Sequence, residues 1–134
     1  MSDTSTQTHI THVGNIIIPI ADQDAALQFY TEKLGFEVRS DQAYGDGFRW
    51  IEVAPPGGQT TVALAPPPPD GPPAGNRETG LGLASDDVEA SHAELKSRGV
   101  DVEDILPLPD PVPPMFWFKD PEGNRSLVVQ RDDQ

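Results

Sequence analysis

The chain has 134 residues, no Cys, and 22 acidic against 9 basic side chains, which give a net charge of −13 at pH 7. This length suits one domain, and the acidic charge repels nucleic acid and anionic lipid but attracts cations. The absence of Cys excludes a disulfide framework, thiolate metal sites and a cysteine nucleophile. The polar N-terminus lacks a signal-peptide pattern and no apolar run reaches the length of a membrane span, so we expect a cytoplasmic protein with neither nucleic-acid nor membrane partners.

The first half of the chain predicts one strand, one helix and three further strands. Residues 13–20 are rich in β-branched side chains and read as a strand. The helix is expected to begin at the N-cap Asp22 and to stop at Gly35, because helices commonly end at such a glycine. Short turns rich in Gly and Pro join the next three segments, which we therefore expect to be antiparallel neighbours: 36–44, 47–54 and 59–66.

The second half repeats this order of elements after a proline-rich tract. A strand at 80–84 precedes a helix at 85–99, whose N-cap is Asp86 or Ser85 and whose stop is Gly99. Three extended segments complete the repeat: 100–106, 114–123 and 124–131. A shift of about 64 residues aligns the two halves, which indicates an internal duplication. We expect a single α+β domain over 12–131, made of module one (12–66), a proline-rich connector (66–78) and module two (79–131).

Two motifs strengthen this reading, namely the helix exit "FYTEKLGFEV" in the first half and "FKDPEGN" before the last strand. With the doubled order of elements, they resemble the vicinal oxygen chelate superfamily, which includes glyoxalase I, extradiol dioxygenases and bleomycin resistance proteins. The resemblance implies two βαβββ modules in tandem, forming a curled mixed sheet around a cleft. It also implies that a second subunit completes the cleft, so we expect a homodimer.

Metal-dependent members of this superfamily place their ligands at four positions, which fall here on Asn15, Ala63, Gly80 and Leu127. Three of these residues have no side-chain donor, and the amide of Asn15 offers one weak oxygen, whereas a catalytic divalent ion needs about three strong protein ligands. The three histidines lie far apart in sequence and lack the spacing of paired ligands. We therefore expect no metal and no other cofactor.

Strand alternation predicts what lines the cleft in place of a metal. The small or apolar residues at the four family positions share one face of the strands, and the alternate residues form the core under the helices. Phe48 and Trp50 lie on the third strand of module one, and Trp117 lies on the corresponding strand of module two. We therefore expect the two tryptophans to occupy comparable places and to offer flat faces for stacking, although each Trp fits a core or dimer-interface position equally well. The predicted ligand-binding residues are Asn15, Phe48, Trp50, Ala63, Gly80, Gly82, Met115, Trp117 and Leu127.

These features favour a metal-independent binding protein resembling the bleomycin resistance proteins. Its partner would be a small organic molecule, cationic and partly aromatic, which it sequesters as an antibiotic resistance protein does. The alternative is a glyoxalase-like lyase or isomerase with an unusual or absent metal site and a Glu or Asp base. A third class, a structural dimer without a ligand, also fits the sequence, which contains no recognisable nucleophile and base pair.

Overall fold

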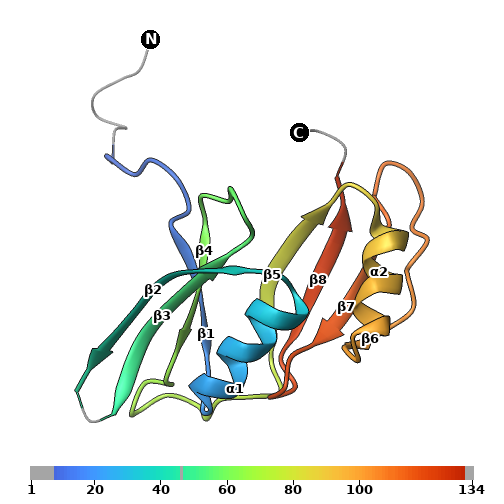
Figure 1. Ribbon diagram of the computed structural model, residues 1–134. Helices are drawn as coiled ribbons and strands as arrows, with labels where there is room; N and C mark the ends of the chain where they lie inside the picture. The colour runs from blue at the N-terminus through green and yellow to red at the C-terminus, as the bar shows by residue number, and fades with distance from the viewer. Residues whose placement is uncertain (1–7, 46, 132–134) are drawn as a thin grey trace.

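The computed structural model describes residues 8–45 and 47–131, which form two modules with the same order of elements (Figure 1). Module one contains β1 (Asn15–Pro19), α1 (Gln23–Gln28), the π-helical turn η2 (Phe29–Lys33), β2 (Glu37–Tyr44), β3 (Phe48–Ala54) and β4 (Thr61–Ala65). Module two contains β5 (Glu78–Ser85), α2 (Val88–Ser97), β6 (Asp101–Val102), β7 (Met115–Lys119) and β8 (Arg125–Gln130). The predicted α+β fold with tandem βαβββ modules is confirmed.

Each module forms one four-stranded mixed sheet, with the strand orders β1-β4-β3-β2 and β5-β8-β7-β6. As predicted from the short turns, β2, β3 and β4 pair antiparallel, while β1 runs parallel to β4. β1 lies at a sheet edge, where Pro19 is tolerated because it has no amide proton to donate. β6 is much shorter than the predicted extended segment 100–106. Beyond Val102 the contact with β7 is irregular: the Glu103 amide donates to the Trp117 carbonyl, and the Leu106 amide donates to the Met115 carbonyl in an isolated bridge.

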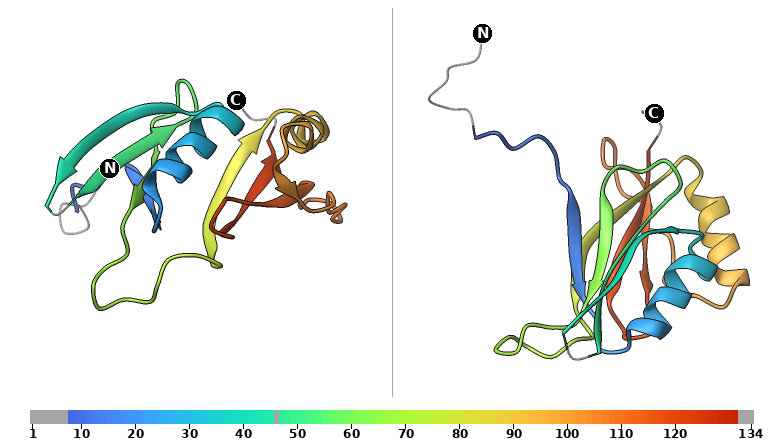
Figure 2. Two further views of the ribbon diagram at one scale, coloured as in Figure 1. Left: turned by 60° about the horizontal axis from the view of Figure 1, so that its bottom comes forward. Right: turned by 60° about the vertical axis from the view of Figure 1, so that its left-hand side comes forward.

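One apolar core joins the two modules. Strand alternation correctly identified its members in both sheets, and the residues that are almost fully buried include Ile18, Ile20, Val62, Leu64, Leu81 and Val128. The rings of Phe29 and Phe118 stack across the modules with their centroids 6.4 Å apart. In the left view of Figure 2, α1 lies between the strands of the first sheet and β5. Each sheet therefore turns one face toward this common core and leaves the other face open.

The helix boundaries follow from their capping residues. Asp22 is the N-cap of α1, as predicted, and its Oδ1 accepts a hydrogen bond from the Ala25 amide at 3.1 Å. The predicted cap of α2 was wrong by one residue: Asp87 accepts from the Ala90 amide at 3.0 Å, because β5 continues through Ser85. Within the described ranges, no helix combines the length and apolar character needed to cross a membrane.

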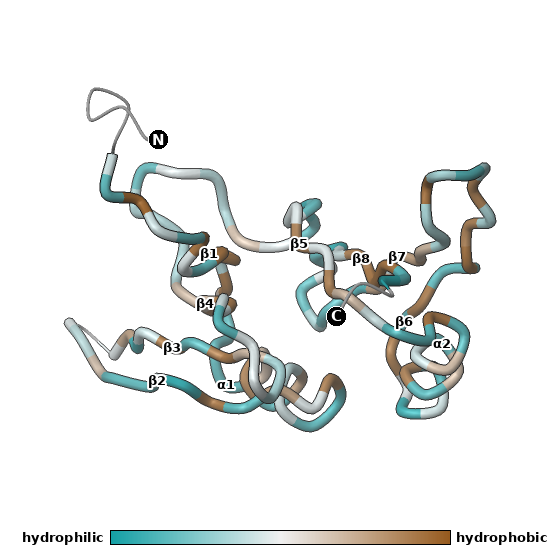
Figure 3. The backbone as a smooth tube through the Cα atoms, turned by 90° about the horizontal axis from the view of Figure 1, so that it is seen from above, coloured by the Kyte–Doolittle hydropathy of each residue, from teal (hydrophilic) through white to brown (hydrophobic). Residues whose placement is uncertain are grey.

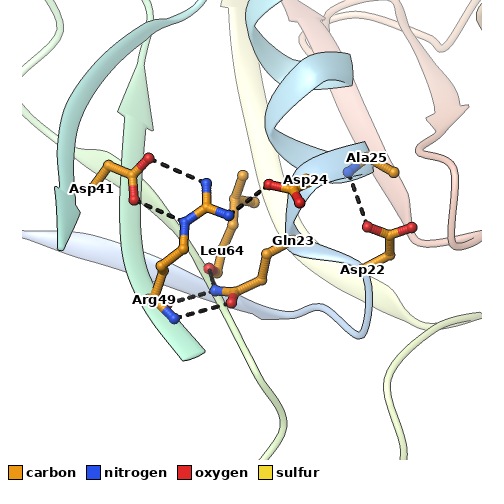
Figure 4. Close-up of polar contacts among 7 residues, drawn as sticks. All are labelled: Asp22, Gln23, Asp24, Ala25, Asp41, Arg49 and Leu64. Carbon is orange, nitrogen blue, oxygen red and sulfur yellow. Dashed lines mark hydrogen bonds and ion pairs between the residues drawn. The ribbon is translucent and has the colours of Figure 1, made fainter. Parts of the chain in front are cut away.

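Gln23 fastens the start of α1 to the sheet beneath it (Figure 4). Its Nε2 donates to the carbonyl oxygens of Arg49 at 2.5 Å and Leu64 at 2.9 Å, and its Oε1 accepts from the Arg49 amide at 3.1 Å. The Arg49 guanidinium lies on the same side and pairs with Asp41 at 3.0 Å and Asp24 at 2.5 Å. Arg49 is thus committed to the helix side of β3 and faces away from the open side of the sheet.

The "FKDPEGN" segment joins module two to module one. The Tyr30 hydroxyl donates to Asp120 Oδ2 at 3.1 Å, and the two side chains are 0% and 5% exposed. Asp120 also accepts from the Asn124 side-chain amide at 2.9 Å and from the backbone amides of Glu122 and Asn124 at 2.9 and 3.0 Å. Burial, and secondly Asp120, raise the pKa of Tyr30 well above its ordinary value, so the phenol keeps its proton and remains a donor.

A second contact from the same segment reaches the start of α1. The Glu122 carboxylate accepts hydrogen bonds from the backbone amides of Ala21 at 3.0 Å and Asp22 at 2.7 Å. A negative charge is favourable there because the amides at a helix N-terminus carry partial positive charge. Gly123 has a φ of +82°, and a Cβ at this position would clash with Asn76 Oδ1, so the turn requires glycine.

We predict that Tyr30→Phe lowers the free energy of unfolding by about 1.5–3 kcal/mol, the range for losing a hydrogen bond to a charged group. The measurement is chemical denaturation. Tyr44→Phe is the matched control, because Tyr44 is 46% exposed and the same atom is removed. Equal stabilities of the two variants would show that the Tyr30–Asp120 bond does not hold the modules together.

Candidate functional site

The open face of the first sheet carries a row of side chains from neighbouring strands. Ile17 of β1 pairs with Ala63 of β4, which in turn pairs with Glu52 of β3, so these three side chains lie side by side on one face. Asn15 lies two residues before Ile17, and Trp50 lies two residues before Glu52 on the same face. The Ala63 side chain is small and the Glu52 carboxylate is therefore the dominant polar group of this row.

Glu52 is held in place by two hydrogen bonds. Thr61 Oγ1 donates to its Oε1 at 2.6 Å, and Trp50 Nε1 donates to its Oε2 at 2.6 Å. These bonds, first from Thr61 and then from Trp50, lower the pKa of Glu52 below its ordinary value despite the opposing effect of burial. The face therefore presents a fixed negative charge beside the ring of a half-buried tryptophan.

The open face of the second sheet has a different arrangement. Gly82 of β5, Leu127 of β8 and Trp117 of β7 lie in one row. The guanidinium carbon of Arg125 lies 4.1 Å from the centroid of the Trp117 ring, a cation–π contact. The chain itself therefore already supplies a cation to Trp117.

The predicted ligand-binding residues fall on these two faces. Asn15, Phe48, Trp50 and Ala63 belong to the first sheet, and the others belong to the second: Gly80, Gly82, Met115, Trp117 and Leu127. Because the helix-covered faces of both sheets share one core, the open faces point outward, and one protomer does not bring the two groups together (Figure 3). Their role in ligand binding remains a prediction.

The two tryptophans do not occupy equivalent rows, contrary to the expectation from the duplicated sequence. Trp117 is paired with Leu127, whose counterpart in the first sheet is Ala63, and Ala63 is paired with Glu52. Glu52 is therefore the equivalent of Trp117. The position of a tryptophan along its own strand does not reveal which residue of the next strand it faces. That register depends on pairing with a strand that is distant in sequence.

Sequence reasoning left Glu52 unassigned and missed Arg125. Side chains alternate along β3, so Glu52 lies on the same face as Trp50. This alternation would have identified Glu52 as a site residue if β3 had been assumed to be regular. No local pattern points to Arg125, because its partners Glu78, Glu103 and Trp117 come from three other parts of the chain. Both residues add charge to faces that were expected to be small, apolar and aromatic.

Two concave sites lie beside the aromatic side chains rather than around them. A cavity of about 490 Å³ lies between the end of η2 and α2, with Leu34, Leu95 and Val128 among its lining residues. A second cavity of about 420 Å³ lies between the start of β4 and β5, and its lining includes Thr61 and the predicted residue Gly82. Neither cavity is lined by Trp50 or Trp117, so the aromatic faces are open surfaces in a single protomer.

The residues present do not fit a divalent metal ion at the four family positions. Asn15 has one amide oxygen, and Ala63, Gly80 and Leu127 have no donor atom in their side chains. Glu52 lies beside Ala63, but each of its oxygens already accepts a short hydrogen bond. Within residues 8–45 and 47–131, no three His, Asp or Glu side chains form a group able to hold a metal ion.

The sequence pattern of the Glyoxalase/Bleomycin resistance protein/Dioxygenase superfamily matches residues 9–126. The chain belongs to this superfamily. The protein YetH of Bacillus subtilis (strain 168) is 29% identical over 127 residues, which cover 90% of this chain and 99% of YetH. The resemblance inferred from the sequence is thus confirmed at the level of the family.

Solved structures show the same fold. TnmS3, an antibiotic binding protein from Streptomyces sp. CB03234, is 38% identical with a TM-score of 0.80, and the match covers 94% of this chain and 100% of TnmS3. A member of the glyoxalase/bleomycin resistance protein/dioxygenase superfamily from Sphaerobacter thermophilus DSM 20745 is 35% identical with a TM-score of 0.84. That match covers 92% of this chain and 99% of the Sphaerobacter protein.

Glu52 gives the site a pH signature. Since its pKa is lower in the folded than in the unfolded chain, its stabilising effect is present above about pH 4.5 and is lost as the pH falls through the folded pKa. We predict that Glu52→Gln destabilises the protein more at about pH 6 than at about pH 3.

Chemical denaturation of both proteins across this pH range provides the measurement. Glu89→Gln is the control, because it removes the same charge from an exposed position on α2. A cost of Glu52→Gln that does not change with pH would contradict the hydrogen-bonded carboxylate.

Proposed function

We propose that the protein binds a small organic molecule, cationic and partly aromatic, without a metal ion and thereby sequesters it. The observation that carries the proposal is the Glu52 carboxylate, fixed beside Trp50 in the middle of the open face of the first sheet. A positioned anion next to an aromatic ring attracts an ammonium group through charge and through the ring face. The net charge of −13 adds a field that concentrates cations near the protein.

Two further observations support binding rather than catalysis. TnmS3, which is 38% identical over nearly the whole chain, is an antibiotic binding protein, and we extend the binding of a small molecule to this chain. The four family metal positions lack a donor set, which removes the Lewis acid that such an enzyme would use. The ligand would therefore be held by charge and stacking alone.

The alternative, a glyoxalase-like lyase or isomerase, needs a general base on the open face. Glu52 is the carboxylate next to Ala63, one of the four family metal positions, but its two hydrogen bonds lower its pKa. An efficient base has a pKa near the working pH, so this shift makes Glu52 a weaker base and a better fixed anion. The geometry of Glu52 thus supports the binding proposal over the enzyme.

The site is proposed to be completed by a second copy of the chain. In one protomer the two aromatic faces point outward, and Ile17, Tyr44 and Phe48 on the first face are 55%, 46% and 47% exposed. Such apolar exposure around a predicted site is typical of a surface that another molecule covers. A homodimer that sets the first face of one protomer against the second face of its partner would enclose a ligand between Glu52 and Trp117.

We predict that 2-naphthylmethylammonium, an aromatic ring with a separate ammonium group, binds and quenches tryptophan fluorescence. Trp50→Ala should weaken binding by about 1–3 kcal/mol, the range for truncating a stacking aromatic. Glu52→Gln should also weaken it, and salt should weaken binding to the parent protein because it screens the charges over about 10 Å at 0.1 M. Titration calorimetry and fluorescence provide the measurements.

Naphthalene-2-carboxylate is the matched control ligand, because it keeps the ring and reverses the charge. A chelator should leave the affinity for 2-naphthylmethylammonium unchanged if no metal takes part. If Trp50 is instead a core residue, Trp50→Ala will cost about 3–5 kcal/mol in stability and no cationic ligand will alter the emission. That result would remove the support for sequestration.

We also predict a homodimer in solution, with twice the chain mass of 14.5 kDa. Light scattering at micromolar concentration measures this mass directly. Ile17→Lys, which places a charge on the exposed open face of the first sheet, should shift the equilibrium toward the monomer. A parent protein that runs at 14.5 kDa would leave the aromatic faces unenclosed and contradict the proposed arrangement.

A further inference from the structure

The cavity of about 490 Å³ between η2 and α2 has aliphatic walls drawn from both modules. Leu34 comes from the end of η2, Leu83 from β5 and Leu95 from α2, and all three side chains are half-buried. Val128 of β8, which is 5% exposed, also lines the cavity. Neither Trp nor Tyr occurs among the described residues that line it, so the cavity suits a saturated chain better than a stacked ring.

Two basic residues meet at the edge of this cavity, where the two modules touch. Lys33 Nζ donates to the Arg98 carbonyl oxygen at 2.7 Å, and Arg98 Nη1 donates to the Lys33 carbonyl oxygen at 2.9 Å. Arg98 Nε also forms an ion pair with Glu94 at 2.9 Å. These reciprocal bonds hold both basic side chains at the cavity, because each is tied to the backbone of the other module.

The charges at this edge do not cancel. Among the described residues that line the cavity, Glu94 is the only carboxylate, and it stands against the two cations Lys33 and Arg98. Every ion pair within residues 8–45 and 47–131 is formed by an arginine, so Lys33 has no carboxylate partner there. Its ammonium has three hydrogens to donate and one printed acceptor, the Arg98 carbonyl. One positive charge therefore remains to meet an anion.

The position of the lining residues on α2 sets the length of a ligand. The cavity is lined by Ala90, Glu94, Leu95 and Arg98, which recur on one side of the helix. From Ala90 to Arg98 the chain advances by about 12 Å at about 1.5 Å per residue, which matches an extended carboxylic acid of about eight carbons. The positive charge lies at the Arg98 end of this length.

We propose that this cavity is a second binding site, which takes a medium-chain aliphatic carboxylate with its charged end at Lys33 and its chain along α2. The net charge of −13 repels anions, so an inorganic anion gains too little at one lysine, whereas a saturated chain adds the burial of apolar surface. The excess positive charge favours a carboxylate over an amine. The site is independent of the proposed binding of a cationic, partly aromatic ligand.

The first test compares octanoate with 1-octanol, which has a chain of the same length and no charge. We expect the parent protein to bind octanoate about threefold or more tightly, the effect of one partly exposed ion pair. Lys33→Gln should reduce this ratio to about one, and Lys33→Arg should keep it because the charge remains. Titration calorimetry measures the affinities, and thermal melting shows that each variant is folded.

Lys96→Gln is the matched control for charge. It removes one positive charge from an exposed position on the same helix, and Lys96 does not line the cavity. This variant should keep the parent ratio of the two affinities.

The second test locates the site by filling it. Ala90→Leu adds a larger side chain at a lining position of α2, and leucine is a good helix former, so the helix should persist. It should weaken the binding of both octanoate and 1-octanol about tenfold or more, because the chain loses the space that it needs. Ala93→Leu is the control, since it makes the same change at an exposed position of α2 outside the cavity.

The outcomes separate this site from the proposed function. Octanoate binding that is unchanged in Ala90→Leu, or equally weakened in Ala93→Leu, overturns the site. A ratio that Lys33→Gln leaves unchanged, or that Lys96→Gln lowers as much, overturns the role of Lys33 and with it the choice of a carboxylate. A parent protein that does not bind octanoate overturns the proposal even if it binds 2-naphthylmethylammonium, and the reverse result removes only the proposed function.

Discussion

The buried hydrogen bond between Tyr30 and Asp120 determines how the two modules sit against each other. The Asp120 carboxylate is buried, with only 5% of the residue exposed. Burial of this group is possible because it accepts hydrogen bonds from four donors. Removing any one of these four donors leaves the buried carboxylate with an unmade hydrogen bond, which costs stability. An arrangement of the modules that lacked these donors would carry the same cost. The Phe29–Phe118 stack and the shared core form around this junction.

The position of the junction also determines where the open faces point. Because both helix-covered faces are used in the common core, the surfaces that carry Trp50 and Trp117 lie on the outside of one protomer. The apolar interaction that stabilises the chain therefore separates the two halves of the candidate site. The core and the proposed binding surface lie on opposite faces of the same strands, because successive side chains of a strand alternate between its two faces.

Much of the fold was predictable, because its signals are local. The alternation of β1, β4, β5 and β8 identified the core, and Asp22 and Gly35 marked the ends of the first helix. The shared row of Ala63 and Glu52, and the position of Arg125 over Trp117, depend on pairing between distant strands. Such register is fixed by tertiary packing, so composition and local periodicity could not supply it.

The π-helical turn η2 has a consequence for the symmetry of the duplicated chain. The segment from the cap Asp22 to Gly35 is one residue longer than the segment from Asp87 to Gly99, and a π-turn accommodates one extra residue within a helix. Tyr30 lies in this turn, and the residues 64 and 65 positions later are Glu94 and Leu95. Neither of these residues carries a phenol, so the junction runs one way: module one supplies the hydroxyl donor and module two supplies the carboxylate acceptor.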